Sequence, residues 1–196
     1  MLKRTLAILL VLICLAVAAS AETVPYTSVT GQFAIDIPAD YVPVTGELVK
    51  LLMQSEDGKA VLNAMGFTDD MMALISDVDF GGIDFIYASD FVGNLNISCQ
   101  ESGGLTMTLM EMFYPTLDSE LKNQYAAYGV AEKDMQPLGI VTKGANRFYG
   151  FKVNMLGLEM GQYIICGGND LMVTLTGTAF DEAVMNAILA SFRFVG

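Results

Sequence analysis

Residues 147–179 read RFYGFKVNMLGLEMGQYIICGGNDLMVTLTGTA, and this stretch decides the fold class. It contains three runs rich in β-branched, aromatic and other apolar residues, separated only by Gly157 and by the Gly-Gly-Asn-Asp of residues 167–170. Glycine, asparagine and aspartate are turn residues. Parallel strands need crossovers of a dozen or more residues, so strands joined by connections this short lie antiparallel. The stretch therefore predicts an antiparallel meander.

The meander extends in both directions along the chain. Upstream, residues 136–143 form another strand-like run, and the Gly-Ala-Asn of residues 144–146 supplies the turn. Downstream, residues 181–192 have the pattern of an amphipathic helix, and residues 192–196 follow as a last short strand or packed tail. Helices and antiparallel strands in separate blocks indicate an α+β fold.

The N-terminal half adds strands and helices to this unit. Residues 33–37 alternate in the manner of a half-buried strand, which Pro38 ends, and residues 83–89 and 94–100 are also strand-like. Residues 46–76 form a helical stretch, in which Thr68 is an N-cap candidate. We expect an antiparallel sheet of about six to seven strands sandwiched by helices.

Residues 105–129 predict a long helix. Its apolar residues recur at every fourth position, at Leu109, Phe113, Leu117, Leu121 and Tyr125. The proline at position 115 interrupts the pattern without changing its phase, and proline removes one backbone hydrogen bond. We therefore expect a kinked helix or two abutting helices.

Residues 1–21 have the features of a signal peptide. Lys3 and Arg4 precede an apolar run at residues 5–18, and Ala-Ser-Ala at residues 19–21 forms a small-residue cleavage site. The apolar run is short for a membrane span, which needs about 20 residues. The sequence thus predicts a secreted protein, extracellular or periplasmic, with residues 22–196 as a single domain and no membrane insertion after cleavage.

Charge and composition exclude several functions. The chain has 22 acidic and 10 basic residues, for a formal net charge of −12, which opposes binding to nucleic acid. It contains no histidine, which excludes Ser-His-Asp and Cys-His catalysis and histidine-ligated metals. We expect a protein without enzymatic activity, catalytic residues or a cofactor.

The segment DVDFGGID at residues 77–84 suggests a calcium loop. Asp77 and Asp79 fit positions 1 and 3 of an EF-hand, and Asp84 adds a third carboxylate. The oxygen donor at position 5 is replaced by Gly81, and the glutamate at position 12 is replaced by Ala88. The pattern favours a turn between helix and strand, with the three aspartates as the metal candidates.

Sulfur-containing residues offer two further sites. Cys99 and Cys166 could form a disulfide in an oxidising compartment, or each could be a small buried hydrophobic residue. Met107, Met110 and Met112 suggest a thioether site for Cu(I), although methionine is above all an adaptable core residue. For the cysteines, the sequence leaves a disulfide and simple burial both open. For the methionines, it favours core packing over a copper site.

Adjacent carboxylates could serve in acid–base hydrolysis of glycosides. Two such pairs occur, Asp69–Asp70 and Asp181–Glu182. Each stands at the start of a predicted helix, where the helix dipole favours acidic side chains. We therefore interpret both pairs as helix-terminal residues.

Four segments together resemble the PsbP-like family: FAIDIP at 33–38, GANRFYGF at 144–151, LMVTLTGTA at 171–179 and ILASFRF at 188–194. The resemblance implies an antiparallel sheet between helices, a fold that this family shares with the Ran-binding Mog protein and with many secreted bacterial domains. It also implies a non-catalytic binding or assembly module with an unknown protein or small-molecule partner. It assigns no site residue. The alternative is an acidic extracellular protein that binds calcium or acts on glycans.

Overall fold

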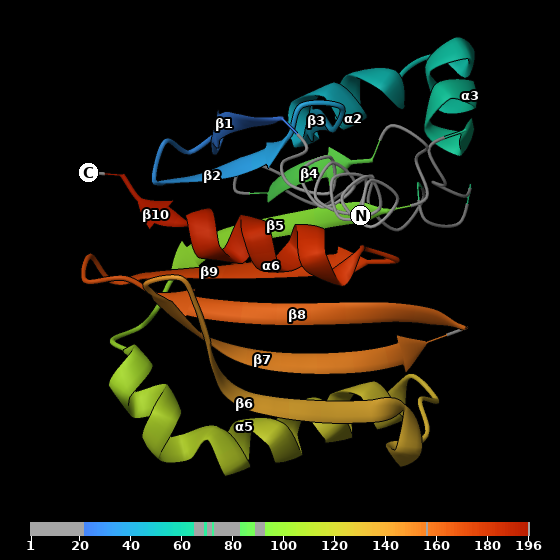
Figure 1. Ribbon diagram of the computed structural model, residues 1–196. Coiled ribbons are helices and arrows are strands. Elements are labelled where there is room, and N and C mark those ends of the chain that lie inside the picture. The colour runs from blue at the N-terminus through green and yellow to red at the C-terminus, as the bar shows by residue number, and fades with distance from the viewer. Residues whose placement is uncertain are drawn as a thin grey trace, which may run out of the picture.

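Two antiparallel β-sheets form the framework of the protein, as the computed structural model in Figure 1 shows. The structure describes residues 22–64, 69, 72, 83–88, 93–155 and 157–195. The large sheet has the strand order β3-β4-β5-β9-β8-β7-β6, and the small sheet has the order β1-β2-β10. The strands are β1 (Thr23–Thr27), β2 (Phe33–Pro38), β3 (Val42–Thr45), β4 (Ile83–Tyr87), β5 (Asn94–Glu101), β6 (Met135–Lys143), β7 (Asn146–Met155), β8 (Leu158–Cys166), β9 (Leu171–Thr178) and β10 (Arg193–Phe194).

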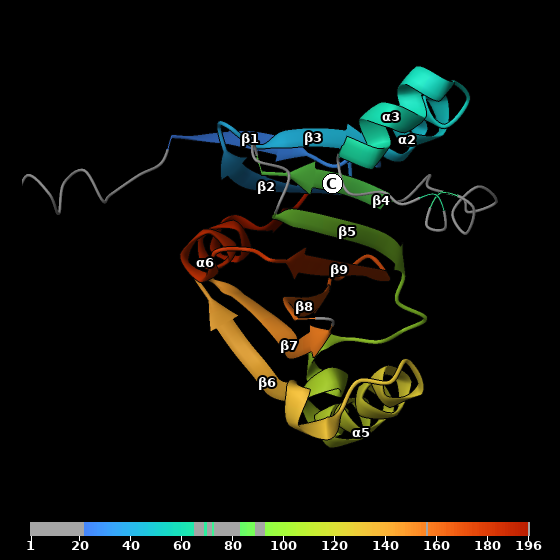
Figure 2. The ribbon, with the colours of Figure 1, turned by 90° about the vertical axis from the view of Figure 1, so that its right-hand side faces the viewer.

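Helices cover both faces of the large sheet (Figures 1 and 2). The helix α6 contacts β2 and β6, the helix α5 contacts β6 and β7, and α2 contacts β3 and β4. None of the described helices has both the length and the apolar composition needed to cross a membrane. The helices are α2 (Gly46–Leu52), α3 (Glu56–Ala64), α5 (Met107–Ala127), the 3₁₀ turn η1 (Glu132–Asp134) and α6 (Glu182–Ser191).

The predicted meander is confirmed. Strands β6, β7, β8 and β9 pair antiparallel in chain order, with Tyr149 opposite Ile164 and Ile165 opposite Val173. The α+β class and the seven-stranded main sheet agree with the sequence-based expectation. The short strands β1 and β3, which contain Pro25 and Pro43, were not predicted, because proline within a short run argues against a strand.

Strand β7 supplies the core on both faces of the large sheet, because consecutive side chains of a strand point to opposite sides. Phe148 is fully buried in the cluster that contains the apolar residues of α6 and β2. Tyr149, Phe151 and Val153 lie in the cluster that α5 covers. This strand therefore joins the two layers of the fold.

The Gly-Ala-Asn turn between β6 and β7 holds the end of α6. The side-chain Nδ2 of Asn146 donates to the carbonyl oxygens of Phe192, at 2.7 Å, and Leu189, at 3.2 Å. Gly144 has a φ of +61°, and a Cβ at this position would lie 2.9 Å from the carbonyl oxygen of Ala190. The turn thus needs glycine both for its backbone conformation and for its close approach to the helix.

The face of the large sheet opposite α6 is apolar at its two ends and polar between them. At one end, Phe85 and Tyr87 of β4 pack with Val49 of α2 and Leu62 of α3. At the other end lies the cluster beneath α5. Between them, β5 and β9 present half-buried polar side chains on this face, namely Asn94, Asn96, Ser98, Thr174 and Thr176.

The predicted helix at residues 105–129 exists, but its buried stripe differs from the expectation. Leu117, Leu121 and Tyr125 pack against the sheet as predicted, whereas Leu109 and Phe113 are exposed and Met110 is buried instead. A spacing of four residues drifts around a helix by about 40° per step, because each residue turns by about 100°. A stripe that faces the sheet at one end therefore faces solvent at the other. The helix contains Pro115 without interruption and bends along its length (Figure 1).

The helical stretch predicted at residues 46–76 is present in its described part as α2 and α3. In α2, Val49 is buried, whereas Leu48 and Leu51 are exposed. The candidate N-cap at Thr68 and most of residues 69–76 lie outside the described residues.

Two phenylalanines that differ in solvent exposure, Phe148 and Phe113, test the assignment of the core. Phe148→Ala should lower the free energy of unfolding by about 3–5 kcal/mol, because it leaves a cavity in a closed layer. Phe113→Ala, at a position 54% exposed, should change it by less than about 0.5 kcal/mol. Urea denaturation of both variants measures the difference. Equal losses would contradict the assigned layers.

Candidate functional site

A groove of about 380 Å³ lies between α5 and the large sheet. Leu117, Leu121 and Gln124 line it from the helix, and Tyr149 of β7 and Ile164 of β8 line it from the sheet. Pockets that bind ligands have volumes of roughly 300–1,000 Å³ and are mostly apolar with a few polar groups. The groove has the size and the composition of a binding site.

The wall of this groove is fixed by a hydrogen bond across the two elements. The hydroxyl group of Tyr149 donates to Oδ1 of Asp118 on α5 at 2.6 Å. Burial, followed by the hydrogen bond and the negative charge of Asp118, raises the pKa of Tyr149 well above its usual value. The tyrosine therefore stays neutral and positions α5 over the sheet.

An exposed apolar surface continues from the groove along the first half of α5. We call it the α5 patch, and it consists of Leu109, Met112, Phe113 and Tyr114. Met112 is 66% exposed, and Phe113 lies one helical turn before Leu117, which lines the groove. Neighbouring exposed apolar side chains of this kind mark interaction surfaces.

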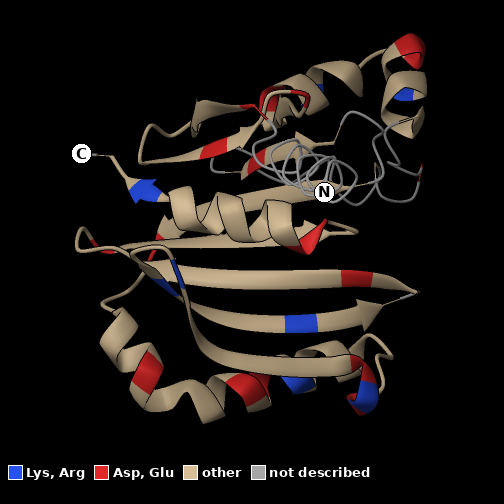
Figure 3. Ribbon diagram, viewed as in Figure 1, with Lys and Arg blue, Asp and Glu red and all other residues tan. Residues whose placement is uncertain are grey.

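The charged residues around the α5 patch are mostly acidic. Glu120 lines the groove, and Glu111 lies within the patch, where Nη2 of Arg147 approaches its Oε2 to 2.6 Å. The basic residues of the described chain are spread over several elements, and two of them, Lys143 and Arg147, are neighbours across the β6–β7 hairpin (Figure 3). The full sequence has a formal net charge of −12.

A second, smaller hollow lies on the α6 face around Lys152. Its volume is about 20 Å³, which is room for about one water molecule. Nζ of Lys152 lies 3.1 Å from Oε1 of Glu159 and 3.5 Å from Oε2 of Glu182. The hydrogen bond to Glu159 raises the pKa of Lys152. Lys152 forms ion pairs with both glutamates, so the charged groups of this hollow bind one another.

The carboxylate pairs lie where a structural role explains them. Oδ1 of Asp181 accepts hydrogen bonds from the backbone N–H groups of Ala183 and Val184, so Asp181 caps α6. Asp69 is exposed, and Asp70 lies outside the described residues. The interpretation as a helix-terminal residue is confirmed for Asp181.

Of the three metal candidates, only Asp84 lies among the described residues, whereas Asp77 and Asp79 lie outside them. Asp84 is fully buried, and its Oδ1 accepts from the hydroxyl of Tyr26 at 2.5 Å and from the N–H of Val29 at 3.0 Å. It thereby ties the β1–β2 hairpin to β4. Within the described ranges, no group of three Asp, Glu, Cys or His side chains could hold a metal ion.

The disulfide considered as one possibility for Cys99 and Cys166 is not formed, and both cysteines are free. Cys99 on β5 packs against the α6 side of the sheet, and its thiol donates to Oε1 of Gln32. Cys166 on β8 belongs to the cluster beneath α5. The two residues face opposite sides of the sheet, and β9 lies between their strands, which keeps their sulfur atoms beyond bonding distance.

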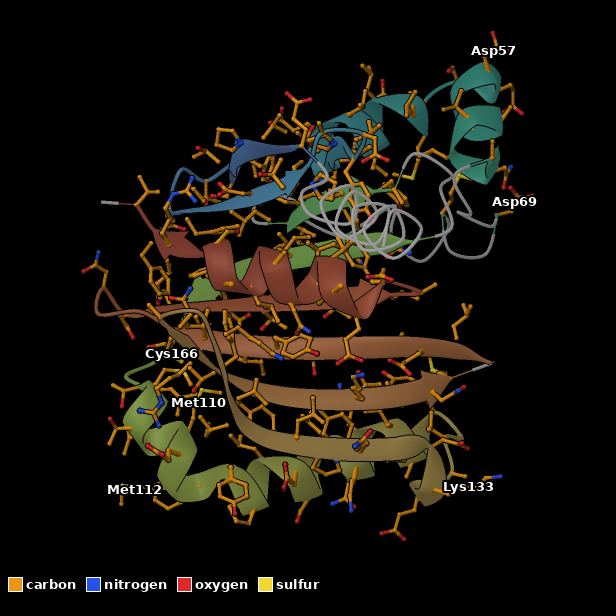
Figure 4. The ribbon with its side chains drawn as sticks, viewed as in Figure 1. Asp57, Asp69, Met110, Met112, Lys133 and Cys166 are labelled. Carbon is orange, nitrogen blue, oxygen red and sulfur yellow. The ribbon has the colours of Figure 1, made fainter. Side chains whose placement is uncertain are left out.

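The three methionines considered as copper ligands lie on different sides of α5. Met112 points outward, whereas Met107 and Met110 point toward Cys166 at the end of β8 (Figure 4). Sequence analysis grouped Met107 with Met110 but did not add Cys166, because Cys166 is 56 residues away from Met110 along the chain. The groove was also missed, although the alternation in residues 147–153 places Tyr149 and Phe151 on one face.

The chain has an α+β fold of the PsbP and Mog type, with helices on both faces of one long antiparallel sheet. Cyanobacterial PsbP (CyanoP) from Synechocystis sp. PCC 6803 matches with a TM-score of 0.51 and 9% identity, over 90% of this chain and 94% of that chain. The Ran-binding protein Mog1p of Saccharomyces cerevisiae matches with a TM-score of 0.50 and 7% identity, over 89% and 96% of the two chains. The predicted resemblance is confirmed for the fold.

A structure from Bacteroides thetaiotaomicron also matches over 90% of this chain, with a TM-score of 0.48 and 13% identity. This chain spans 50% of the length of that one. No family model matches the sequence, and no curated protein matches it. The fold is therefore defined, and the function has to be argued from the surface of this chain.

The buried tyrosine at the groove predicts a loss of stability at high pH. Folding raises the pKa of Tyr149, so the protonated hydroxyl stabilises the fold, fully below about pH 10 and progressively less above it. Burial likewise raises the pKa of Tyr87 to about 12. Urea denaturation from pH 8 to pH 12 should show a shallower decline for Tyr149→Phe than for the unmodified protein. Tyr128→Phe, at an exposed position, should leave the decline unchanged, and identical curves for all three proteins would contradict the prediction.

Proposed function

We propose that the protein is an exported, non-catalytic binding module that docks a polypeptide on the α5 patch and its groove. The observation that carries this proposal is the turn of α5 at residues 111–116, in which all six side chains are exposed and three of them are large and apolar. Exposed apolar surface of this kind is costly in water unless a partner covers it.

A binding role agrees with the chemistry of the chain. The chain has no histidine. Tyr149 and Lys152, the polar groups that line the two hollows described above, are held by Asp118 and Glu159 in structural hydrogen bonds. One of the proteins that share the fold is a Ran-binding protein, which is consistent with binding as the use of this architecture. These observations support a binding module over a hydrolase.

The partner that fits this surface is a polypeptide with apolar side chains flanked by Lys or Arg. Phe113 and Met112 supply apolar contacts, and the adjacent groove can accept a side chain between Leu117 and Leu121. Glu120 at the groove and the net charge of −12 favour basic flanking residues. Aromatic residues and methionine are enriched at such interfaces.

Peptide display tests the docking site directly. A random peptide library is selected on the unmodified protein after depletion on Phe113→Asp, and individual peptides are then measured by calorimetry. Selected peptides should combine apolar and basic residues, and Phe113→Asp should weaken their binding by at least about tenfold, equivalent to about 1.4 kcal/mol.

Leu51→Asp is the matched control, because Leu51 is 62% exposed on α2, away from the patch. This variant should bind the selected peptides as the unmodified protein does. Peptides that lose affinity equally with both variants, or a selection that yields only acidic sequences, would refute the proposed site.

Export rests on the signal-peptide pattern of residues 1–21. Mass spectrometry of the protein recovered from the source cells should find a mature N-terminus at Glu22, in the medium or in the envelope fraction. Recovery of the intact chain from the cytosol, with Met1 or Leu2 as its N-terminus, would contradict export while leaving the docking site to its own test.

A further inference from the structure

Two sulfur atoms are in contact, and a third lies nearby, where the first turn of α5 crosses the end of β8. The thiol Sγ of Cys166 lies 3.5 Å from Sδ of Met110, and the backbone N–H of Cys166 lies 3.3 Å from Sδ of Met107. Figure 4 shows Met110 and Cys166 facing each other, with Met112 on the outer side of the helix. The two elements thus place the Met110 thioether in contact with the Cys166 thiol and the Met107 thioether beside the backbone of the same cysteine.

The separation of these sulfur atoms suits a shared metal ion. A sulfur ligand lies about 2.3 Å from its metal, so two sulfurs on one ion in trigonal geometry lie about 4 Å apart. The observed 3.5 Å between Cys166 Sγ and Met110 Sδ is close to this value. Only a small movement of flexible methionine side chains is needed to admit an ion.

We infer that Met107, Met110 and Cys166 form a binding site for a soft monovalent metal ion of the Cu(I) class. Thiolate and thioether ligands select soft ions such as Cu(I), whereas hard divalent ions prefer oxygen. One thiolate and two neutral thioethers carry a single negative charge, which a monovalent ion neutralises. A divalent ion would leave a net positive charge in a half-buried site, at a cost in free energy.

The binding step is an exchange of a proton for the metal ion. In the metal-free protein the Cys166 thiol carries a proton, which the metal ion has to displace. On binding, the S–H bond breaks, a sulfur–metal bond forms, and the proton leaves to solvent without any change of oxidation state. The two thioethers donate lone pairs and release nothing.

The site is reachable from solvent on one side. Met110 is 1% exposed and forms the floor, whereas Met107 and Cys166 are each half-buried. Bound metal would join α5 to β8 at the end of the helix that precedes the exposed α5 patch. The site is separate from the groove and does not depend on the proposed docking function.

Silver and copper titrations test this site in a Cys14→Ser background, which removes the third cysteine of the chain. The protein is titrated with Ag(I), and separately with Cu(I) under anaerobic conditions against a chromophoric competitor. We expect one ion per chain, no binding to Cys166→Ser, and affinity lowered by at least about tenfold in Met110→Leu, equivalent to about 1.4 kcal/mol.

Two matched controls separate this site from adventitious sulfur binding. Cys99→Ser removes a thiol on the opposite face, and Met112→Leu removes an exposed methionine of the same helix. Both should bind as the parent protein does, and bound Ag(I) should protect Cys166 but not Cys99 from alkylation, as read by peptide mass spectrometry. Thermal unfolding verifies that every variant is folded. No binding to the parent protein, or loss of binding in Cys99→Ser but not in Cys166→Ser, would overturn the inference.

Discussion

The fold depends on one constraint: helices pack on both faces of the large sheet, so a strand that lies between them must present buried side chains to two different layers. Strand β7 meets this requirement with Phe148 on the α6 side and with Tyr149 and Phe151 on the α5 side. A slip of one residue in register would exchange the two sets and place the Tyr149 hydroxyl in the apolar layer that now holds Phe148. Gly150 allows the close approach of Leu138, whose side chain lies 3.2 Å from the position of an added Cβ.

This constraint explains which parts of the fold could be predicted from the sequence. The strands β6 to β9 are runs of strand-forming residues joined by turns that contain glycine, so local pattern is sufficient for them. Strands β1 and β3 contain proline and exist because neighbouring strands pair with them, which no local pattern reveals. The exposed half of α5 was misassigned because Leu109 and Phe113 are apolar residues that face solvent.

The candidate sites depend on contacts between residues distant in sequence, which is why sequence analysis recovered them only in part. Met107 and Met110 were recognised as soft ligands, but their thiol partner Cys166 is brought to them by the pairing of β8 in the sheet. The groove likewise forms only when Tyr149 of β7 meets Asp118 of α5. Both features involve α5, which packs on the sheet and contributes residues to each of them.

The central claim is that a sheet packed on both faces carries a helix whose side chains at residues 111–116 are all exposed. Native-state hydrogen exchange measures this directly, because each amide reports the free energy of its own opening. Amides of β7 and β9 should exchange only through global unfolding, and those of residues 111–114 and 116, since Pro115 has no amide hydrogen, should exchange at least about a hundredfold faster. Equal protection of residues 111–116 and of β7 would contradict it.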